Sequence, residues 1–219
     1  MPVLIYCAGK NQRFEAVAHA AGFRIGVQLP NTVYHSVYFA DQDWKRPNRT
    51  AYIAALKRHQ PHMATVLDLE RHDQLPEVLG WAEDAAAFVR QVLIIPKYSG
   101  AVDHLPRRIG GADVVLAYSV PTAFGGTEVP IWEFCGWPVH LLGGSPHRQM
   151  DIARYFNVVS TDGNMANKMA HRGRFWSEEK GPKGHWRNLR EIGVDLPTDN
   201  NLEAFRRSCE NIAEAWKRL

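Results

Sequence analysis

Short apolar runs alternate with longer amphipathic segments along most of the chain. Each run is bounded by polar or turn-forming residues, which is typical of buried strands. The seven runs are 3–6, 37–40, 64–67, 92–95, 114–117, 138–142 and 157–160. Continuous apolar strands that alternate with helices indicate a parallel sheet with both of its faces covered.

Helical spacing fills most of the gaps between these runs. Phe14, Val17, Ala18 and Ala21 recur at the spacing of one helix face, and Gly22 ends the pattern. Further helices are predicted over 48–59, 76–89, 146–155 and 202–219. The segment 172–201 differs, because it is rich in Gly, Pro, Lys and Trp, and it is predicted to be a basic loop with at most a short helix. We expect one domain over 1–219, closed by the helix at 202–219.

The composition is that of an ordinary soluble globular protein. The chain has 219 residues, of which 45% are apolar and 22% charged, so one sizeable core is expected. The net charge is 26 − 23 = +3, which permits a polyanionic partner without requiring one. Three widely spaced cysteines, no secretory leader and no apolar run of about 20 residues predict a cytoplasmic protein without a membrane partner.

Charged side chains follow several of the predicted strands. Asp41 and Asp68 stand directly after an apolar run, and Lys97 and Asp162 follow one after a single intervening residue. In parallel α/β folds the carboxyl ends of the strands meet on one rim, where ligands bind. One such aspartate alone is as well explained by a helix cap. Several acids on one rim are costly without a use, so they favour a functional site.

Two turns add candidate binding groups. Gly143-Gly144-Ser145 lies between a strand and a helix, where free backbone N–H groups can meet a phosphate, a carboxylate or the edge of a purine. Tyr118-Ser119 precedes a glycine-containing stretch that is typical of a binding loop. The alternatives are a tight strand-to-helix turn for the first and a shaped crossover for the second.

Positive charge gathers late in the chain among aromatic residues. This combination suits a nucleic-acid backbone and unstacked bases, although a solvated basic loop with buried Trp anchors explains it as well. The candidate contacts are Lys168, His171, Arg172, Arg174, Lys183 and Arg187. No His/Cys spacing matches a metal site, and no Ser-His-Asp or Cys-His signature is found in the sequence.

The order of these strand-end motifs resembles that of the tRNA-guanine transglycosylases and of the phage and bacterial DNA 7-deazaguanine transglycosylases. The block from Val139 to Pro146, followed by a helix and by the strand that ends in Asp162-Gly163-Asn164, is similar to the late part of that family's pattern. The segment 38–176 resembles phage-type proteins of this superfamily. Two features of the family are replaced or missing: Gln42-Asp43-Trp44 stands where the family has Ser-Gly-Gly-Phe, and the zinc ligands of the tRNA enzymes are absent.

The resemblance implies a compact α/β barrel of the TIM type. Because seven strands are identified, the eighth unit is expected to be incomplete or irregular. By the same resemblance Asp162 is the nucleophile and Asp41 the general base. The residues that would bind substrate are Asp68, Lys97, Tyr118, Ser119, Gly143, Gly144, Ser145 and Asn164.

The implied reaction exchanges guanine for a 7-deazaguanine in nucleic acid, through a covalent aspartyl-glycosyl intermediate. The partners would be DNA, favoured over tRNA, and a free 7-deazaguanine base. The chemistry needs neither a metal nor an organic cofactor. Two alternatives stay open: a nucleotide-processing hydrolase on an open, doubly wound sheet, and a nucleic-acid-binding protein without enzymatic activity.

Overall fold

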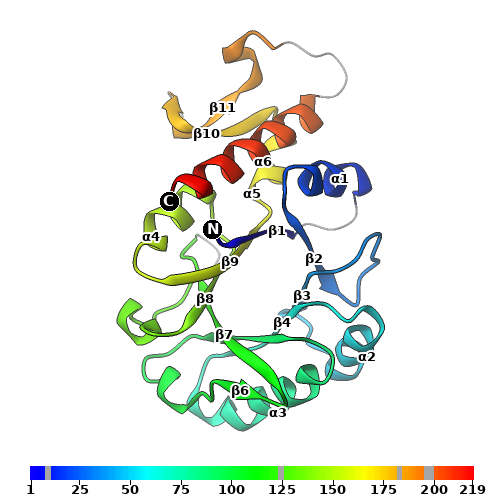
Figure 1. The fold of residues 1–219 in the computed structure, drawn as a ribbon, viewed down its shortest axis with the longest axis vertical. Coiled ribbons are helices and arrows are strands. Elements are labelled where there is room, and N and C mark those ends of the chain that lie inside the picture. Colours follow the sequence, from blue (N-terminus) through cyan, green and yellow to red (C-terminus); the bar gives the residue numbers. More distant parts are fainter. Residues whose placement is uncertain (8–10, 123–125, 182–183, 195–199) are drawn as a thin grey trace.

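The computed structural model describes residues 1–7, 11–122, 126–181, 184–194 and 200–219. Eight parallel strands form a closed ring, in the order β5-β4-β3-β2-β1-β9-β8-β7, and β5 pairs with β7 to complete it (Figure 1). The strands are β1 (Val3–Cys7), β2 (Arg24–Leu29), β3 (Phe39–Gln42), β4 (Met63–Leu69), β5 (Gln91–Pro96), β7 (Ala112–Ser119), β8 (Pro138–Leu142) and β9 (Asn157–Gly163). The TIM-type barrel is therefore confirmed, and the open, doubly wound sheet is excluded.

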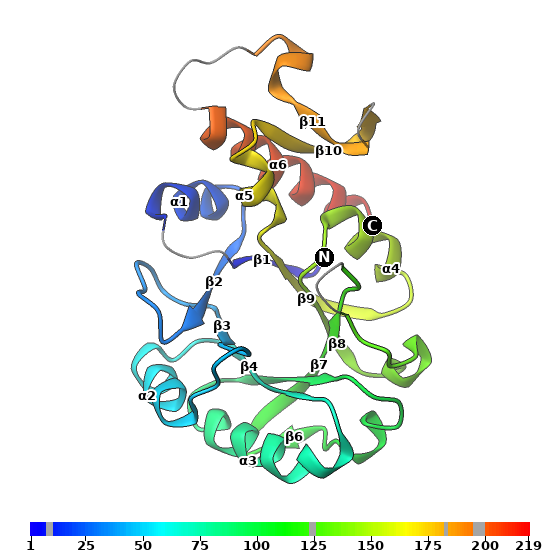
Figure 2. The same cartoon turned by 180° about the vertical axis from the view of Figure 1, so that it is seen from behind.

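Helices cover the outside of the ring (Figures 1 and 2). They are α1 (Gln12–Ala20), α2 (Arg49–His59), α3 (Leu75–Ala86), α4 (Pro146–Ala153), α5 (Met165–Ala170) and α6 (Asn200–Arg218). The short strand β6 (Arg108–Ile109) lies antiparallel to β7, and residues 30–38 join β2 to β3 without a helix. Among the described residues, no helix has both the length and the apolar character needed to cross a bilayer.

Alternation along the strands divides the core into two layers. Inside the ring, a compact cluster fills the lumen with Ile5, Phe39, Met63, Leu93, Ile95, Val115 and Ala117. The strand residues of opposite parity pack outward against the helices in a much larger apolar cluster. The lumen is thus plugged by side chains along most of its length, and polar groups are left only at its mouth.

The eighth strand is one that the hydrophobic pattern does not reveal. Arg24–Leu29 reads Arg-Ile-Gly-Val-Gln-Leu, with polar residues near both ends and a glycine inside. Gly26 faces the lumen, where a Cβ would lie 2.8 Å from Phe39 Cδ1 and 2.9 Å from Ile5 Cγ2. The absence of a side chain at Gly26 makes room for the Phe39 ring, which explains why this strand lacks a continuous apolar run.

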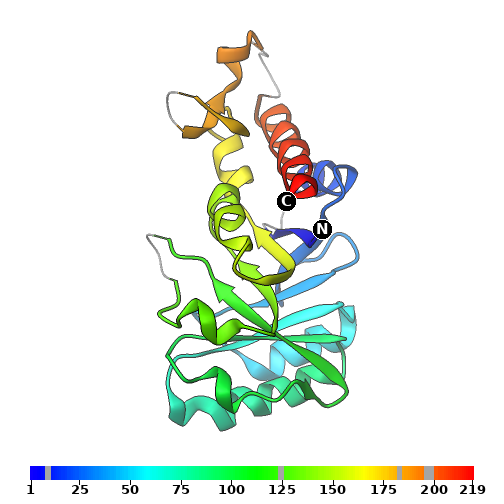
Figure 3. The same ribbon diagram turned by 60° about the vertical axis from the view of Figure 1, so that its left-hand side comes forward.

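The late basic segment is a hairpin and not the predicted loop. Strand β10 (Arg174–Gly181) pairs antiparallel with β11 (Gly184–Asn188), and a 3₁₀ turn follows at Leu189–Ile192. Figure 1 shows this hairpin on the far side of α6 from the barrel, and in Figure 3 it lies beside α6. The loop prediction is wrong because Phe175 and Trp176 are buried, and their burial supplies the apolar contact that an ordered hairpin needs.

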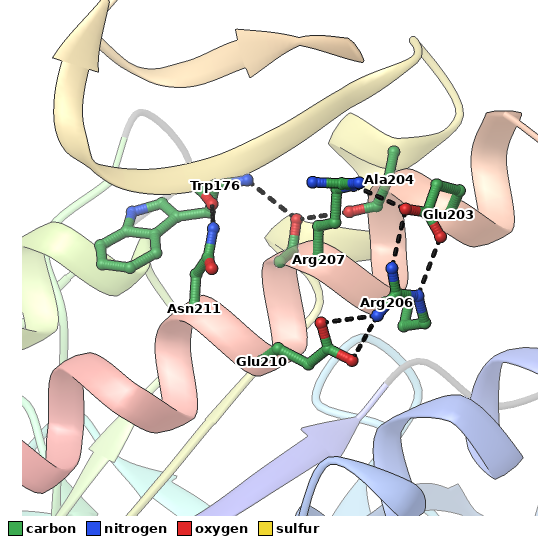
Figure 4. Close-up of polar contacts among 8 residues, drawn as sticks. Trp176, Glu203, Ala204, Arg206, Arg207, Glu210 and Asn211 are labelled. Atoms are coloured by element: carbon green, nitrogen blue, oxygen red, sulfur yellow. Dashed lines mark hydrogen bonds and ion pairs between the residues drawn. The ribbon is translucent and has the colours of Figure 1, made fainter. Parts of the chain in front are cut away.

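Polar contacts fasten the hairpin to α6 (Figure 4). The Trp176 N–H donates to Ser208 Oγ at 2.9 Å, and Asn211 Nδ2 donates to the Trp176 carbonyl at 2.8 Å. On the neighbouring turns of α6, Arg206 contacts both Glu203 and Glu210 through its guanidinium. The predicted closing helix is α6, and it packs against α1, α5 and β10.

The packing of β2 against Phe39 can be tested with a glycine substitution. We expect Gly26→Ala to lower the free energy of unfolding by about 1–3 kcal/mol, because the methyl group overpacks the lumen. Gly80→Ala is the matched control, since Gly80 is inside α3 and its Cβ would meet the Arg49 side chain at 3.4 Å. The control should be neutral or stabilising by up to about 1 kcal/mol. Urea unfolding measures both, and equal effects would contradict the packing described for β2.

Candidate active site

A cavity of about 570 Å³ lies at the carboxyl ends of the barrel strands. Its volume is in the range that holds small-molecule ligands. Seven of the residues predicted for the site line it, namely Asp41, Asp68, Lys97, Ser119, Gly143, Gly144 and Asp162. They come from β3, β4, β5, β7, β8 and β9 or from the residues that directly follow these strands. The expectation that the strand-end acids meet on one rim is therefore met.

Two nitrogen atoms contact the Asp162 carboxylate at the end of β9. The Gly143 backbone N–H donates to Asp162 Oδ1 at 2.8 Å, and His140 Nε2 lies 3.3 Å from the same oxygen. The Asp162 side chain is only 11% exposed to solvent. Gly143 has φ of +66°, a conformation that favours glycine, and it directs the N–H at the carboxylate.

Gln149 ties the same two strand ends together from outside. Its side-chain amide donates to the Gly143 carbonyl at 2.6 Å and to the Asp162 carbonyl at 2.7 Å. Gln149 belongs to α4 and is buried. The backbone that carries the carboxylate is thus fixed by a helix as well as by the sheet.

Asp41 belongs to β3 and lines the same cavity. Thr65 Oγ1 donates to Asp41 Oδ1 at 3.0 Å and accepts from the Gln42 N–H at 2.9 Å. Burial, and next the nearby charge of Asp162, raise the pKa of Asp41 from 3.8 to about 7, against the opposing hydrogen bond from Thr65. Near neutral pH this carboxyl group can therefore either give or take a proton.

Asp68 and Lys97 form an ion pair at the ends of β4 and β5, across the ring from Asp162. Lys97 Nζ lies 3.3 Å from Asp68 Oδ2 and also donates to the Gly126 carbonyl at 3.2 Å. Burial raises the pKa of Asp68, and the ammonium of Lys97 opposes that shift. The register of β4 shifts between Thr65 and Asp68, and this irregularity turns the Asp68 side chain toward the cavity. In a regular strand, Leu67 and Leu69 would point to the cavity instead, on the same side as Thr65.

The sequence did not point to several residues of the site. His140 and Thr65 are fully buried polar residues inside apolar runs, and that interruption was the available signal. Trp44, which is 62% exposed, stands on the cavity wall directly after the Gln42-Asp43 pair. The sequence could not have identified Gln149, because the pattern of a helix does not show which of its side chains reaches the ends of the strands.

Three predicted binding residues lie away from the cavity wall. The Tyr118 ring packs outward against Phe134 and Phe156, with ring centroids 5.3 and 4.8 Å apart. Ser145 is buried, and its hydroxyl lies 3.2 Å from His147 Nε2. Asn164 is the residue that precedes α5. Strand alternation explains the first case, because Ser119 faces inward and its neighbour must face outward.

The predicted nucleic-acid contacts divide into two groups. Lys168 and Arg172 are exposed on and just after α5, and the exposed His171 stacks on Phe14 with centroids 5.5 Å apart. Arg174 and Arg187 belong to the hairpin. Arg187 lies 3.7 Å from Glu179 and 3.8 Å from Glu191, so its charge is partly neutralised. Lys183 is outside the described residues.

Within the part of the chain that the structure describes, no group of three or more His, Cys, Asp or Glu side chains is placed to hold a metal ion. The cavity instead offers two carboxyl groups in different environments, one held by N–H donors and one whose pKa is close to neutrality. Such a pair suits nucleophilic attack by one group and proton transfer by the other.

Comparison with known proteins supplies a family and a fold. The model of a family described as of unknown function, DUF6610, matches residues 18–217. No curated protein matches the sequence. Among solved structures, the YdjI aldolase from Escherichia coli K12 is similar with a TM-score of 0.57 and 12% identity, over 99% of this chain and 90% of that chain. At 12% identity this likeness shows that the two proteins share the TIM-barrel fold, and it carries no information about activity.

The elevated pKa of Asp41 makes stability depend on pH. Because folding raises this pKa, the protonated carboxyl group is favoured in the folded state, and its contribution is lost as the pH rises from about 4 to about 7. We expect Asp41→Asn to raise the free energy of unfolding at pH 8 by up to about 4 kcal/mol, since a pKa raised by one unit corresponds to about 1.4 kcal/mol, and to change it little below pH 4. Urea unfolding at both pH values measures this. Asp103→Asn, at an exposed position, is the control, and an equal gain there would refute the assignment.

Proposed function

The chain belongs to DUF6610, a family whose description assigns no activity, and we propose a function for it from its site. In this proposal, the protein exchanges guanine for a 7-deazaguanine base in nucleic acid, through a covalent bond to Asp162. The observation that carries this proposal is the placement of Asp41 and Asp162 in one cavity. The contacts of Asp162 suit an ionised nucleophile, and the pKa of Asp41, about 7, suits a proton donor. The enzymatic TIM barrel of the structural neighbour makes an enzyme plausible.

The first half of the reaction releases guanine. A carboxylate oxygen of Asp162 attacks the anomeric carbon and forms a C–O bond, while the glycosidic C–N bond breaks and its electron pair moves to the leaving nitrogen. The proton of Asp41 neutralises that nitrogen. In the second half, the incoming base gives its proton to Asp41 and its nitrogen attacks the same carbon, which releases Asp162.

The cavity walls offer complementary groups for a planar, polar base. The Asp68 carboxylate accepts hydrogen bonds, the Lys97 ammonium donates them, and both line the cavity. The exposed indole of Trp44 provides a ring on which a base can stack. A purine carries donors and acceptors on its edges, so this set of groups fits such a ligand.

A nucleic-acid substrate must also be held outside the cavity. Lys168 and Arg172 are exposed beside α5, and α5 begins two residues after the end of β9. Positive charge so close to Asp162 along the chain favours contacts with phosphates that flank an extruded nucleotide. A target in duplex DNA would have to be flipped out of its stack.

The role of Asp162 can be tested by following labelled guanine in DNA and in tRNA. The protein is incubated with each nucleic acid and a panel of 7-deazaguanines, and the nucleosides are then identified by mass spectrometry. We expect exchange with the wild type and at least a thousandfold loss in Asp162→Asn, because the nucleophile is removed. Asp103→Asn is the control and should retain activity.

The same experiment separates the alternatives. A wild-type protein that binds nucleic acid without exchanging a base is a binding protein, and the proposal is then wrong. Exchange that continues in Asp162→Asn would show that another group is the nucleophile. A protein–nucleic acid adduct that survives denaturing electrophoresis and is absent from the variant would support the covalent intermediate.

The release of guanine should also depend on pH through Asp41. This group donates a proton only while protonated, so the single-turnover rate should fall about tenfold per pH unit above its pKa of about 7. Asp41→Asn should slow release by about 10²–10⁴-fold and abolish that descending limb. The release of radiolabelled guanine, measured across this pH range in the wild type and in Asp41→Asn, gives both the rate and its pH dependence. An unchanged limb in the variant would assign the proton to another group.

A further inference from the structure

A fully buried histidine stands behind the proposed nucleophile. His140 is in β8 with no exposed surface, and its ring lies 5.3 Å from that of Phe39 inside the barrel. Its Nε2 is 3.3 Å from Asp162 Oδ1, and its Nδ1 is 2.8 Å from Ser160 Oγ. An imidazole in an apolar lumen requires partners for both nitrogens, and here both have one.

The chemistry of these partners determines the tautomer. An ionised carboxylate only accepts hydrogen bonds, so Nε2 must carry the hydrogen that points at Asp162. In a neutral ring Nδ1 then has no hydrogen and must accept one from the Ser160 hydroxyl. Ser160 is 1% exposed, so water does not compete for this contact. The carboxylate therefore selects the tautomer, and the serine stabilises it by donating its hydroxyl hydrogen to the bare Nδ1.

Both N–H donors at Asp162 contact the same oxygen. The Gly143 backbone N–H and His140 Nε2 converge on Oδ1, while Gln149 fixes the Asp162 backbone through its carbonyl. A carboxylate bound through one oxygen by two donors cannot rotate freely. Among the described residues no hydrogen-bond donor contacts Oδ2, which leaves this oxygen for the ligand in the cavity.

We propose that Ser160 and His140 are positioning residues that hold Asp162 by Oδ1 and present Oδ2 as the attacking oxygen. This inference rests on the proposed function for the attack, but the tautomer and the contacts do not depend on it. A fixed orientation lowers the barrier because the reacting atoms need no further alignment. Loss of either residue should therefore slow the attack more than it weakens substrate binding.

The tautomer can be measured without any substrate. Long-range ¹H–¹⁵N correlation on histidine-labelled protein distinguishes the two ring nitrogens, and His140→Gln identifies the resonances of His140. We expect a hydrogen on Nε2 and none on Nδ1 in the wild type near pH 7. In Ser160→Ala this preference should weaken. A hydrogen on Nδ1 alone in the wild type would overturn the proposed arrangement, whatever the protein catalyses.

Kinetics then test the consequence. Ser160→Ala should reduce kcat for base exchange about 10- to 100-fold with little change in KM, and Ser160→Thr, which restores the hydroxyl, should recover much of the loss. His140→Gln keeps an N–H donor and should be less impaired than His140→Phe. Circular dichroism and thermal unfolding establish that each variant is folded.

Thr161→Val is the matched control. Thr161 is the next residue of β9, is also buried, and donates its hydroxyl to the Leu141 carbonyl at 3.2 Å without contacting Asp162. It should lose stability because a buried hydrogen bond is removed, while kcat stays within about twofold of the wild type because the lost hydroxyl does not contact the carboxylate. If Ser160→Ala affects kcat no more than Thr161→Val does, the positioning role is refuted. If the wild type itself exchanges no base, the proposed function fails and the spectroscopic result still decides the geometry.

Discussion

Two largely buried carboxyl groups that face one cavity are costly, because burial removes most of the water that would otherwise stabilise their charges. Most of the polar structure at the barrel mouth lowers that cost. Asp162 receives the Gly143 N–H and the His140 ring, while Asp41 receives the Thr65 hydroxyl. The remaining cost is seen in the raised pKa of Asp41, which binds a proton more readily instead of gaining a cation as partner.

The closed ring of strands is what makes this concentration of charge possible. Its lumen is filled with aliphatic and aromatic side chains, so polar groups can stand only where the strands end. Each strand contributes one or two inward positions at that level, which brings acids from distant parts of the chain together. The ion pair of Asp68 with Lys97 places a cation across the ring from Asp162, at the ends of β4 and β5, and β4 is next to the strand that carries Asp41.

The sequence predicts much of this framework, because strongly apolar strands and capped helices are local signals. The strand-end acids were predictable for the same reason, since a strand's end is visible in the pattern. The strand at Arg24–Leu29 was not, because its glycine only makes sense beside Phe39, which lies in another strand. The inward turn of Asp68 depends on a register shift, and the contact of His140 with Asp162 depends on the pairing of β8 with β9. These are tertiary facts that no single segment encodes.

The position of β1 between β2 and β9 affects the order in which the barrel can fold during synthesis. Ile5 is in register with Asp162, so the first strand must wait for more than two thirds of the chain before its second neighbour is available. Until then the ring is open, its lumen has an exposed edge, and Asp162 has no cavity around it. Contacts so distant along the chain form slowly. The strands that carry Asp41, Asp68 and Lys97 are therefore made before the ring can close around Asp162.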